Sequence, residues 1–138
     1  MILKNSLVFI FLFILCIRVI DGDTIVIEGG EKIRLIGVDT PELHHPKKPV
    51  QYYAKEAKKF TKSLVEEKDV QLEYDRQRKD KYGRTLAYVY LKDRTFLNIE
   101  IIKQGYGFAY TKFPFKYLIK FKEYEKEARE QKKGLWGR

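Results

Sequence analysis

The sequence predicts an α+β fold built mainly on a small β-barrel. The 138 residues leave room for one domain with one hydrophobic core. Four or five short runs of β-branched and alternating apolar residues are interrupted by three segments with helical periodicity. These strands and helices do not alternate as they do in βαβ units, which indicates helices added to a barrel.

The first half of the chain predicts a hairpin followed by a helix. Residues 24–27 and 32–38 are β-branched runs, and the Glu-Gly-Gly-Glu sequence at 28–31 between them is typical of a hairpin turn. Gly37 inside the second run predicts a β-bulge. A polar loop leads to a helical segment at 50–68, with lysines opposite its apolar face. Its apolar stripe is Ala54, Ala57, Phe60, Leu64 and Val65.

The second half predicts two strands and two helices. Strands are expected at 70–74 and 85–91, and a short helix is expected at 96–104, before Gly105. An aromatic, irregular segment separates it from the last helix, at 117–133. The buried stripe of that helix is expected to be Tyr117, Phe121, Tyr124 and Ala128, and Gly134 is expected to cap its C-terminus.

The composition narrows the classes of partner and site. Lys and Arg total 28 against 19 Asp and Glu, which gives a net charge of +9. Such a surface attracts nucleic acid, an anionic membrane or an acidic polymer, although it is also compatible with a merely basic, soluble protein. The single cysteine, Cys16, excludes an internal disulfide and a cysteine-based zinc cluster.

An uncharged apolar run occupies residues 7–17, and Arg18 follows it. As a helix this run would be roughly 16 Å long, about half of a bilayer core, which suits the apolar region of a secretory signal better than a spanning helix. No small-residue cleavage site follows. Residues 1–17 are therefore expected to be a signal-like or anchor-like segment before a domain at 18–138, in a secreted or membrane-associated protein. The alternatives are a cytoplasmic protein and a long first strand at 8–20.

Three polar clusters stand where strands are expected to end. The first is Asp21-Gly22-Asp23-Thr24, the second combines Arg34 with Asp39-Thr40-Pro41-Glu42, and the third is Asp80-Lys81-Tyr82-Gly83-Arg84. Each cluster alone would be explained by a turn or a helix start. Together they contain the groups that hydrolysis of a phosphodiester needs.

That chemistry requires a counter-charge for the diester, charge stabilisation in the transition state and an activated water. Carboxylates favour a hard cation such as calcium or magnesium, and arginines bind phosphate oxygens as planar, permanently charged groups. A further carboxylate can orient or deprotonate water. The candidates are Asp23 and Asp39 for the metal, Arg34 and Arg84 for the phosphate, and Glu42 for the water.

These clusters, in this order and spacing, closely resemble the motifs of the staphylococcal nuclease (thermonuclease) family. The similarity extends from Arg18 to Trp136 and includes His45-Pro46-Lys47-Lys48, Gln104-Gly105 and Gly134-Leu135-Trp136. The resemblance implies a five-stranded OB-fold barrel with three helices. It also implies a calcium-dependent nuclease that cleaves DNA and RNA to 3′-phosphorylated products.

The resemblance further implies a role for each matching residue. Asp23 and Asp39 match the calcium carboxylates, and Thr40 matches the residue that offers its backbone carbonyl to the ion. Arg34 matches the arginine that binds the phosphate and stabilises its transition state, and Arg84 matches the arginine assigned to the transition state or leaving group. The remaining matches are Glu42 as general base or water-positioning group, Lys81 and Tyr82 at a terminal phosphate, and Tyr110 beside sugar and base.

Several alternatives remain open from the sequence. His44 and His45 could bind zinc, but adjacent histidines in a Pro-Lys loop are more often solvated. Asp21 could join the metal site or only form the turn, and Trp136 could plug the core or stack on a base. A non-catalytic OB-fold module that binds nucleic acid is the competing function, although it would not need the complete catalytic set. No protein partner is implied, a monomer is expected, and residues 7–17 could contact a membrane.

Overall fold

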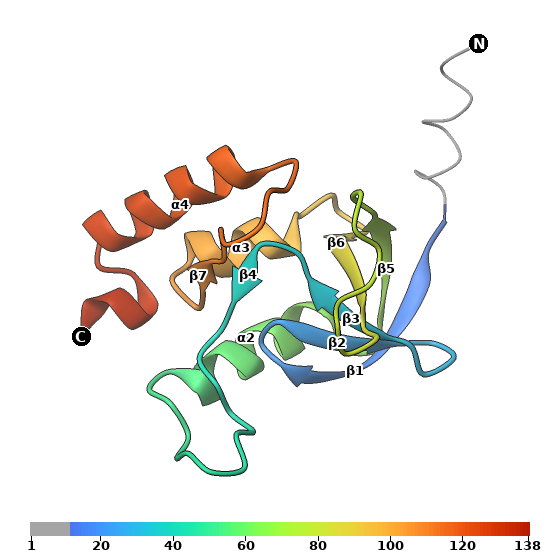
Figure 1. The fold of residues 1–138 in the computed structure, drawn as a ribbon, viewed down its shortest axis with the longest axis horizontal. Helices are drawn as coiled ribbons and strands as arrows, with labels where there is room; N and C mark the ends of the chain where they lie inside the picture. The colour runs from blue at the N-terminus through green and yellow to red at the C-terminus, as the bar shows by residue number, and fades with distance from the viewer. Residues whose placement is uncertain (1–11) are drawn as a thin grey trace.

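The fold is known from a computed structural model that describes residues 12–138, and it is a closed barrel with helices packed around it (Figure 1). Five strands close the barrel in the order β1-β2-β3-β6-β5. They are β1 (Ile14–Asp21), β2 (Thr24–Ile27), β3 (Lys32–Leu35), β5 (Lys68–Glu73) and β6 (Thr85–Leu91). The remaining elements are β4 (Val38–Asp39), β7 (Phe108–Ala109), α2 (Ala54–Val65), α3 (Leu97–Lys103), α4 (Leu118–Glu130) and the 3₁₀ helix η1 (Gly134–Gly137). The predicted five-stranded OB-fold barrel with three α-helices is confirmed.

Strand β1 closes the barrel because it pairs with two strands at once. Cys16 lies opposite Ile27 of β2 and also opposite Lys68 of β5, both in antiparallel register. β3 and β6 form the one parallel pair of the barrel in the described chain, with Arg34 opposite Leu86. Outside the barrel, β4 and β7 form a small antiparallel ladder that places Asp39 opposite Phe108.

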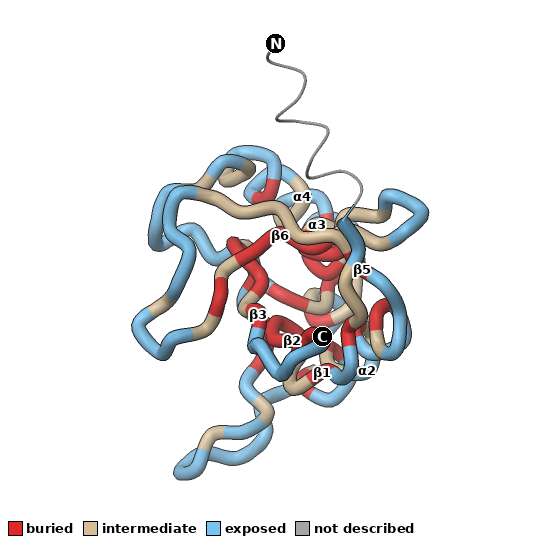
Figure 2. The backbone as a smooth tube through the Cα atoms, turned by 90° about the vertical axis from the view of Figure 1, so that its right-hand side faces the viewer, coloured by how far each residue is buried: buried red, intermediate tan, exposed pale blue. Residues whose placement is uncertain are grey.

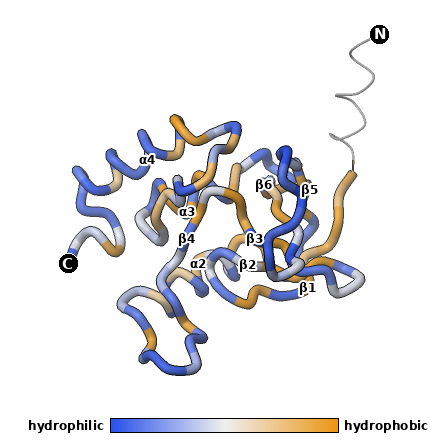
Figure 3. Tube along the Cα trace, in the orientation of Figure 1, coloured by the Kyte–Doolittle hydropathy of each residue, from blue (hydrophilic) through white to orange (hydrophobic). Residues whose placement is uncertain are grey.

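The hydrophobic core fills the barrel and continues beneath the helices. Figure 2 shows the buried residues gathered along the strands of the barrel and on α3, with exposed residues on the loops outside. α4 is mostly hydrophilic (Figure 3), and it packs on the core through Phe121 and Ala128, which are both buried. Tyr117 and Tyr124 of the predicted stripe are partly buried against the same core.

Two predicted elements are shorter in the structure because the backbone turns inside them. The helix expected at 50–68 begins only at Ala54, after Tyr53 adopts a left-handed conformation with φ of 71°, and ends at Val65. The run expected at 32–38 is divided by a turn in which Gly37 has φ of 74°, so that β4 leaves the barrel. The segment expected to be irregular at 106–115 contains the short strand β7.

The apolar N-terminal run is part of the barrel from Ile14 onward. Cys16 is completely buried in the core, so the barrel begins before the expected boundary at Arg18. Residues 1–11, which make up most of the signal-like or anchor-like segment expected at 1–17, lie outside the described residues. Within residues 12–138, the helices are too short or too polar for a membrane crossing.

Two half-buried carboxylates connect β5 and the loop after it to the segment that leads into α4. Asp75 accepts hydrogen bonds from the Tyr88 hydroxyl at 2.5 Å, the Lys116 amide at 2.9 Å and the Arg76 amide at 2.7 Å. Glu73 accepts hydrogen bonds from the Tyr90 and Tyr117 hydroxyls. Burial alone would raise the pKa of Asp75, but these hydrogen bonds outweigh it and hold the pKa below its ordinary value of 3.8.

The lowered pKa predicts an acid-sensitive contribution of Asp75 to folding. Because the folded-state pKa lies below the unfolded one, this contribution is fully present above the ordinary value and is lost as the pH falls through the folded-state pKa. Asp75→Asn should therefore lower the free energy of unfolding at pH 7 and flatten its decline as the pH falls below about 4, measured by urea denaturation. Asp69→Asn, which removes only an exposed ion pair with Lys92, should change it by less than about 1 kcal/mol. An unchanged acid decline in Asp75→Asn would contradict the assignment.

Candidate functional site

The three polar clusters of the sequence meet in one small pocket of about 160 Å³. Asp21 ends β1, the turn before β2 contributes Asp23, and Asp39 ends β4, so the first two clusters deliver carboxylates to the same place, and the third cluster contributes Arg84. The pocket is lined by Asp21, Asp23, Arg34, Asp39, Thr40, Pro41, Glu42 and Arg84. The structure therefore brings together the six residues predicted for metal and catalysis, and it adds Asp21.

The turn between β1 and β2 lies against Thr40 because residue 22 is a glycine. A Cβ atom at Gly22 would come within 2.8 Å of Cγ2 of Thr40 and 3.0 Å of Cβ of Ala57. The turn is also tied to α2, since the buried Thr61 hydroxyl donates to the Gly22 carbonyl at 2.7 Å. The close approach to Thr40 and α2 thus fixes the two aspartates of this turn.

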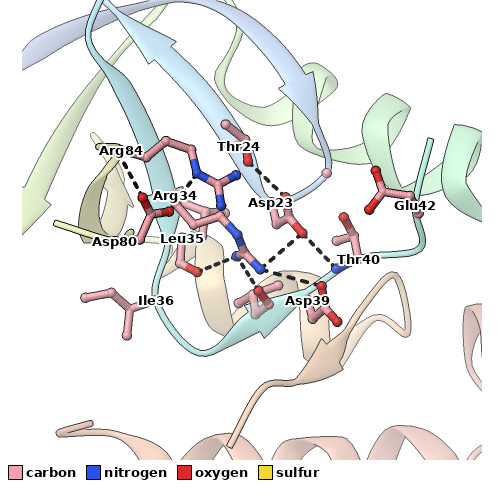
Figure 4. Close-up of polar contacts among 12 residues, drawn as sticks. Asp23, Thr24, Arg34, Leu35, Ile36, Asp39, Thr40, Glu42, Asp80 and Arg84 are labelled. Carbon is pink, nitrogen blue, oxygen red and sulfur yellow. Dashed lines mark hydrogen bonds and ion pairs between the residues drawn. The ribbon is translucent and has the colours of Figure 1, made fainter. Parts of the chain in front are cut away.

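Arg34 lies between the two predicted metal carboxylates (Figure 4). Its Nη2 atom is 3.5 Å from Oδ2 of Asp23 and 3.5 Å from Oδ1 of Asp39. Its Nη1 atom donates to the carbonyls of Leu35 at 2.9 Å and Val38 at 2.5 Å. With 15% of its side chain exposed, the guanidinium is held by carboxylates on one edge and by the β3–β4 turn on the other.

The turn that Arg34 grips is itself fixed by a buried asparagine. The side-chain amide of Asn98 donates to the Ile36 carbonyl at 2.9 Å, and its oxygen accepts from the Val89 amide at 2.9 Å. Asn98 is fully buried at the start of α3. It therefore connects the β3–β4 turn to strand β6.

The carboxylates differ in how well they are satisfied. Asp23 accepts hydrogen bonds from the Thr24 hydroxyl and the Thr40 amide, both at 3.0 Å. Oδ1 of Asp21 is buried and accepts no hydrogen bond in the described chain, although Nε2 of His44 lies 3.5 Å away. Burial and the charge of Asp23 raise the pKa of Asp21 and that of Asp39, where Arg34 opposes the shift.

This charge distribution fits a hard cation. Every carboxylate in the pocket offers oxygen ligands, the soft ligand Cys16 is buried in the core and does not line the pocket, and the crowded negative charge would be relieved by a positive ion. Within residues 12–138, however, no three His, Cys, Asp or Glu side chains are already arranged as a metal cluster. Arg34 stands between Asp23 and Asp39 instead, so a cation would have to share these carboxylates with it.

Arg84 is held at only one of its nitrogens. Its Nε atom donates to Oδ2 of Asp80 at 2.7 Å, while Oδ1 of Asp80 accepts from the Tyr82 and Arg84 amides at 2.9 Å. Its two terminal nitrogens have no hydrogen-bond partner in the described chain. The pair with Asp80 thus orients a guanidinium whose outer edge remains free for an anion.

The predicted substrate contacts lie outside the pocket walls. Lys81 and Tyr82 are exposed, and Tyr82 has 72% of its surface accessible. Tyr110 follows β7, and its amide donates to the Gly37 carbonyl at 2.8 Å, so it stands near the strand that carries Asp39. Sequence reasoning did not single out Phe113, which is 56% exposed with its ring centroid 6.3 Å from that of Tyr110.

The two histidines do not converge on one site. His44 faces Asp21, whereas Nδ1 of His45 accepts the Lys47 amide at 3.0 Å within the loop. Trp136 packs edge-on against Phe108 with a centroid separation of 5.4 Å. These contacts favour a solvated loop for the histidines and a packing role for the tryptophan.

Comparisons with known proteins find nucleases among the relatives of this chain. A family model described as staphylococcal nuclease homologue matches residues 32–138. A thermonuclease of Staphylococcus intermedius is 50% identical over 125 residues, covering 88% of this chain and 74% of that protein. A thermonuclease of Staphylococcus hyicus is 48% identical, over 87% and 73% of the two chains. The endonuclease YncB of Bacillus subtilis is 42% identical, over 88% of this chain and 60% of its own length.

The tight turn at Gly22 predicts a steric test of the site. Gly22→Ala should lower the free energy of unfolding by about 1–3 kcal/mol, because its Cβ would overlap Thr40 and Ala57. Thr40→Ser removes the Cγ2 atom. The double variant should therefore lose less free energy of unfolding than the two single variants lose together. Chemical denaturation of the four proteins of this cycle measures both effects. Strict additivity would show that the Thr40 contact does not limit the turn.

Proposed function

The chain belongs to the staphylococcal nuclease family and is a nuclease that hydrolyses phosphodiester bonds in nucleic acid, and from this premise we propose a calcium-dependent reaction carried out in the carboxylate–arginine pocket. The observation that carries the proposal is the meeting of four carboxylates and two arginines in one pocket of about 160 Å³. This combination matches the charges of a phosphodiester bound beside a divalent cation.

The residues that would hold the cation are Asp23, Asp39 and the backbone carbonyl of Thr40, with Asp21 beside them. Calcium suits this set because all the donors are oxygens. When bound, such an ion supplies positive charge next to the phosphate and makes a coordinated water more acidic. The unpartnered Oδ1 atom of Asp21 and the raised pKa values of Asp21 and Asp39 support a cation at this position.

The two arginines would stabilise the phosphate as its negative charge grows. Arg84 can offer both terminal nitrogens to the phosphate oxygens, because Asp80 occupies only its Nε atom. Arg34 is held beside Asp23 and Asp39 and can extend the same positive surface toward the phosphate. A guanidinium remains charged throughout the reaction, so this stabilisation does not depend on pH.

Glu42 would act on the attacking water. Its carboxylate lines the pocket and makes no hydrogen bond or ion pair in the described chain, which leaves both oxygens able to accept from water. It can accept the proton of the water or only orient it, and either role requires the same placement. If Arg84 stabilises the departing 5′ oxygen, the phosphate remains on the 3′ end of the product.

Lys81, Tyr82 and Tyr110 would contact the substrate on either side of the scissile phosphate. Lys81 contributes charge near a terminal phosphate, and the exposed ring of Tyr82 lies beside Lys81 and Arg84. The ring of Tyr110 can stack on a sugar or base. Such contacts do not depend on the base sequence of the substrate, and they support activity on both DNA and RNA.

The metal requirement can be tested with single-stranded DNA. Activity should vanish with a calcium chelator and return with calcium, whereas zinc alone should not restore it, because the ligands are all hard oxygen donors. Asp39→Asn should weaken calcium binding in a calorimetric titration. Full activity in the chelator would overturn the proposal.

The arginine roles predict large rate losses in stably folded variants. Arg34→Lys and Arg84→Lys should each lower kcat by about 10²- to 10³-fold, because an ammonium group cannot reproduce the planar two-nitrogen contact with phosphate. Lys132→Ala, which removes an exposed charge elsewhere, provides the control. A near-normal kcat in either arginine variant, with circular dichroism verifying the fold, would refute its assigned role.

A further inference from the structure

Glu42 is the charged member of the pocket whose orientation depends on its backbone alone. The side chains of Asp23, Arg34 and Arg84 are each held by hydrogen bonds or ion pairs. The Glu42 carboxylate has no such contact among residues 12–138, and Figure 4 shows it at the edge of the cluster with no interaction drawn to it. Its position must therefore be set by whatever fixes its main chain.

The main chain of Glu42 is anchored mainly by one residue, Gln51. The Glu42 amide donates to Oε1 of Gln51 at 2.6 Å, and the Gln51 amide donates to the Glu42 carbonyl at 3.0 Å. On the other side, the Thr40 amide donates to Oδ2 of Asp23, and Pro41 restricts the backbone between these two anchors. Gln51 therefore holds both the backbone N–H and the backbone C=O group of Glu42.

Gln51 is in turn attached to the start of α2. Its carbonyl accepts the amide of Ala54, the first residue of the helix, at 3.1 Å. The helix returns to the pocket through Thr61, whose hydroxyl donates to Gly22 between the two turn aspartates. Asp23, Thr40, Glu42, Gln51 and α2 thus form a closed ring of contacts.

The loop at 43–50 lies outside this ring. Figure 1 shows the chain between β4 and α2 projecting away from the barrel before it returns to the helix. The loop is mostly exposed and carries Lys47 and Lys48, which suits contact with a polyanion. Because Glu42 and Gln51 are paired at its base, the hydrogen bonds that hold the Glu42 backbone do not involve the loop.

We propose that Gln51 is a positioning residue that holds Glu42 in place to act on the attacking water. This inference rests on the role proposed for Glu42 above. The oxygen of the Gln51 side chain, which accepts the Glu42 amide, is the essential atom. Without it, water would solvate that exposed amide, the fold would persist, and the carboxylate would lose its fixed distance from the phosphate.

Two substitutions separate the oxygen from the size of the side chain. Gln51→Met keeps the length but removes the acceptor, and it should lower kcat about 10- to 100-fold while changing KM for single-stranded DNA and calcium affinity less than about twofold. Gln51→Glu keeps an acceptor oxygen and should restore most of kcat. Asp93→Ala removes a comparable contact, from Asp93 Oδ1 to the Thr95 amide at 3.0 Å, in a turn elsewhere, and should leave kcat unchanged.

A double-mutant cycle with Glu42→Gln identifies the residue through which Gln51 acts. If Gln51 only positions Glu42, Gln51→Met should cause no further loss of kcat in the Glu42→Gln background. An equal loss in both backgrounds, or a wild-type kcat for Gln51→Met, would overturn the role of Gln51 and leave that of Glu42 intact. A wild-type kcat for Glu42→Gln would instead overturn the assignment of Glu42 and, with it, this role of Gln51.

Discussion

The contact of Arg34 with Asp23 and Asp39 is the interaction on which the rest of the site depends. Carboxylates within a few ångströms of one another repel strongly when they are partly shielded from water, and four of them line one small pocket. The guanidinium of Arg34 lies 3.5 Å from two of them and is itself supported by two backbone carbonyls. It compensates Asp23 and Asp39, but it leaves Asp21 with an unpartnered buried oxygen. The negative charge of the pocket is therefore only partly compensated by the protein. Such a pocket favours binding of an added cation.

The barrel supports this arrangement by fixing the turns that carry the charges. Gly37 allows the chain to turn away from β3, and Asn98 connects that turn to β6. The carbonyls that accept hydrogen bonds from Arg34 are thereby held in position. On the opposite side, Gly22 allows close packing on Thr40, and Thr61 ties the same turn to α2. Buried polar groups thus reach the site from two helices. Removing the hydrogen bonds of Asn98 or of Thr61 would leave a buried backbone group unpaired. A change that disturbs the geometry of the pocket in this way should therefore also destabilise the fold.

Much of the fold and the acidic and basic members of the site could be predicted from the sequence, because both follow local patterns. The predicted strands at 24–27 and 85–91 coincide with β2 and β6, since β-branched runs and flanking turn residues define them. The predicted helix ends are less accurate. The left-handed conformation of Tyr53, which delays the start of α2, is not indicated by the residue types around it. Thr61, Asn98 and Gln51 could not be identified, because each acts on a backbone group distant in the chain or across a loop. Such contacts depend on the closed barrel, and a single sequence contains no periodicity or spacing that marks them.

The two arginines of the pocket are not equivalent, and the difference follows from what holds each one. Arg34 is restrained on both edges of its guanidinium and compensates the carboxylates before any ligand arrives. Arg84 is restrained only at Nε by Asp80, so its outer edge faces the pocket with its charge available. A phosphate can therefore bind Arg84 at little cost in reorganisation, whereas Arg34 must share its charge between phosphate and carboxylates. A cation beside Asp23 and Asp39 would weaken the hold of these carboxylates on Arg34. Binding of the cation and binding of the phosphate by Arg34 should then each increase the affinity for the other. This coupling follows from the arrangement of charges in the pocket.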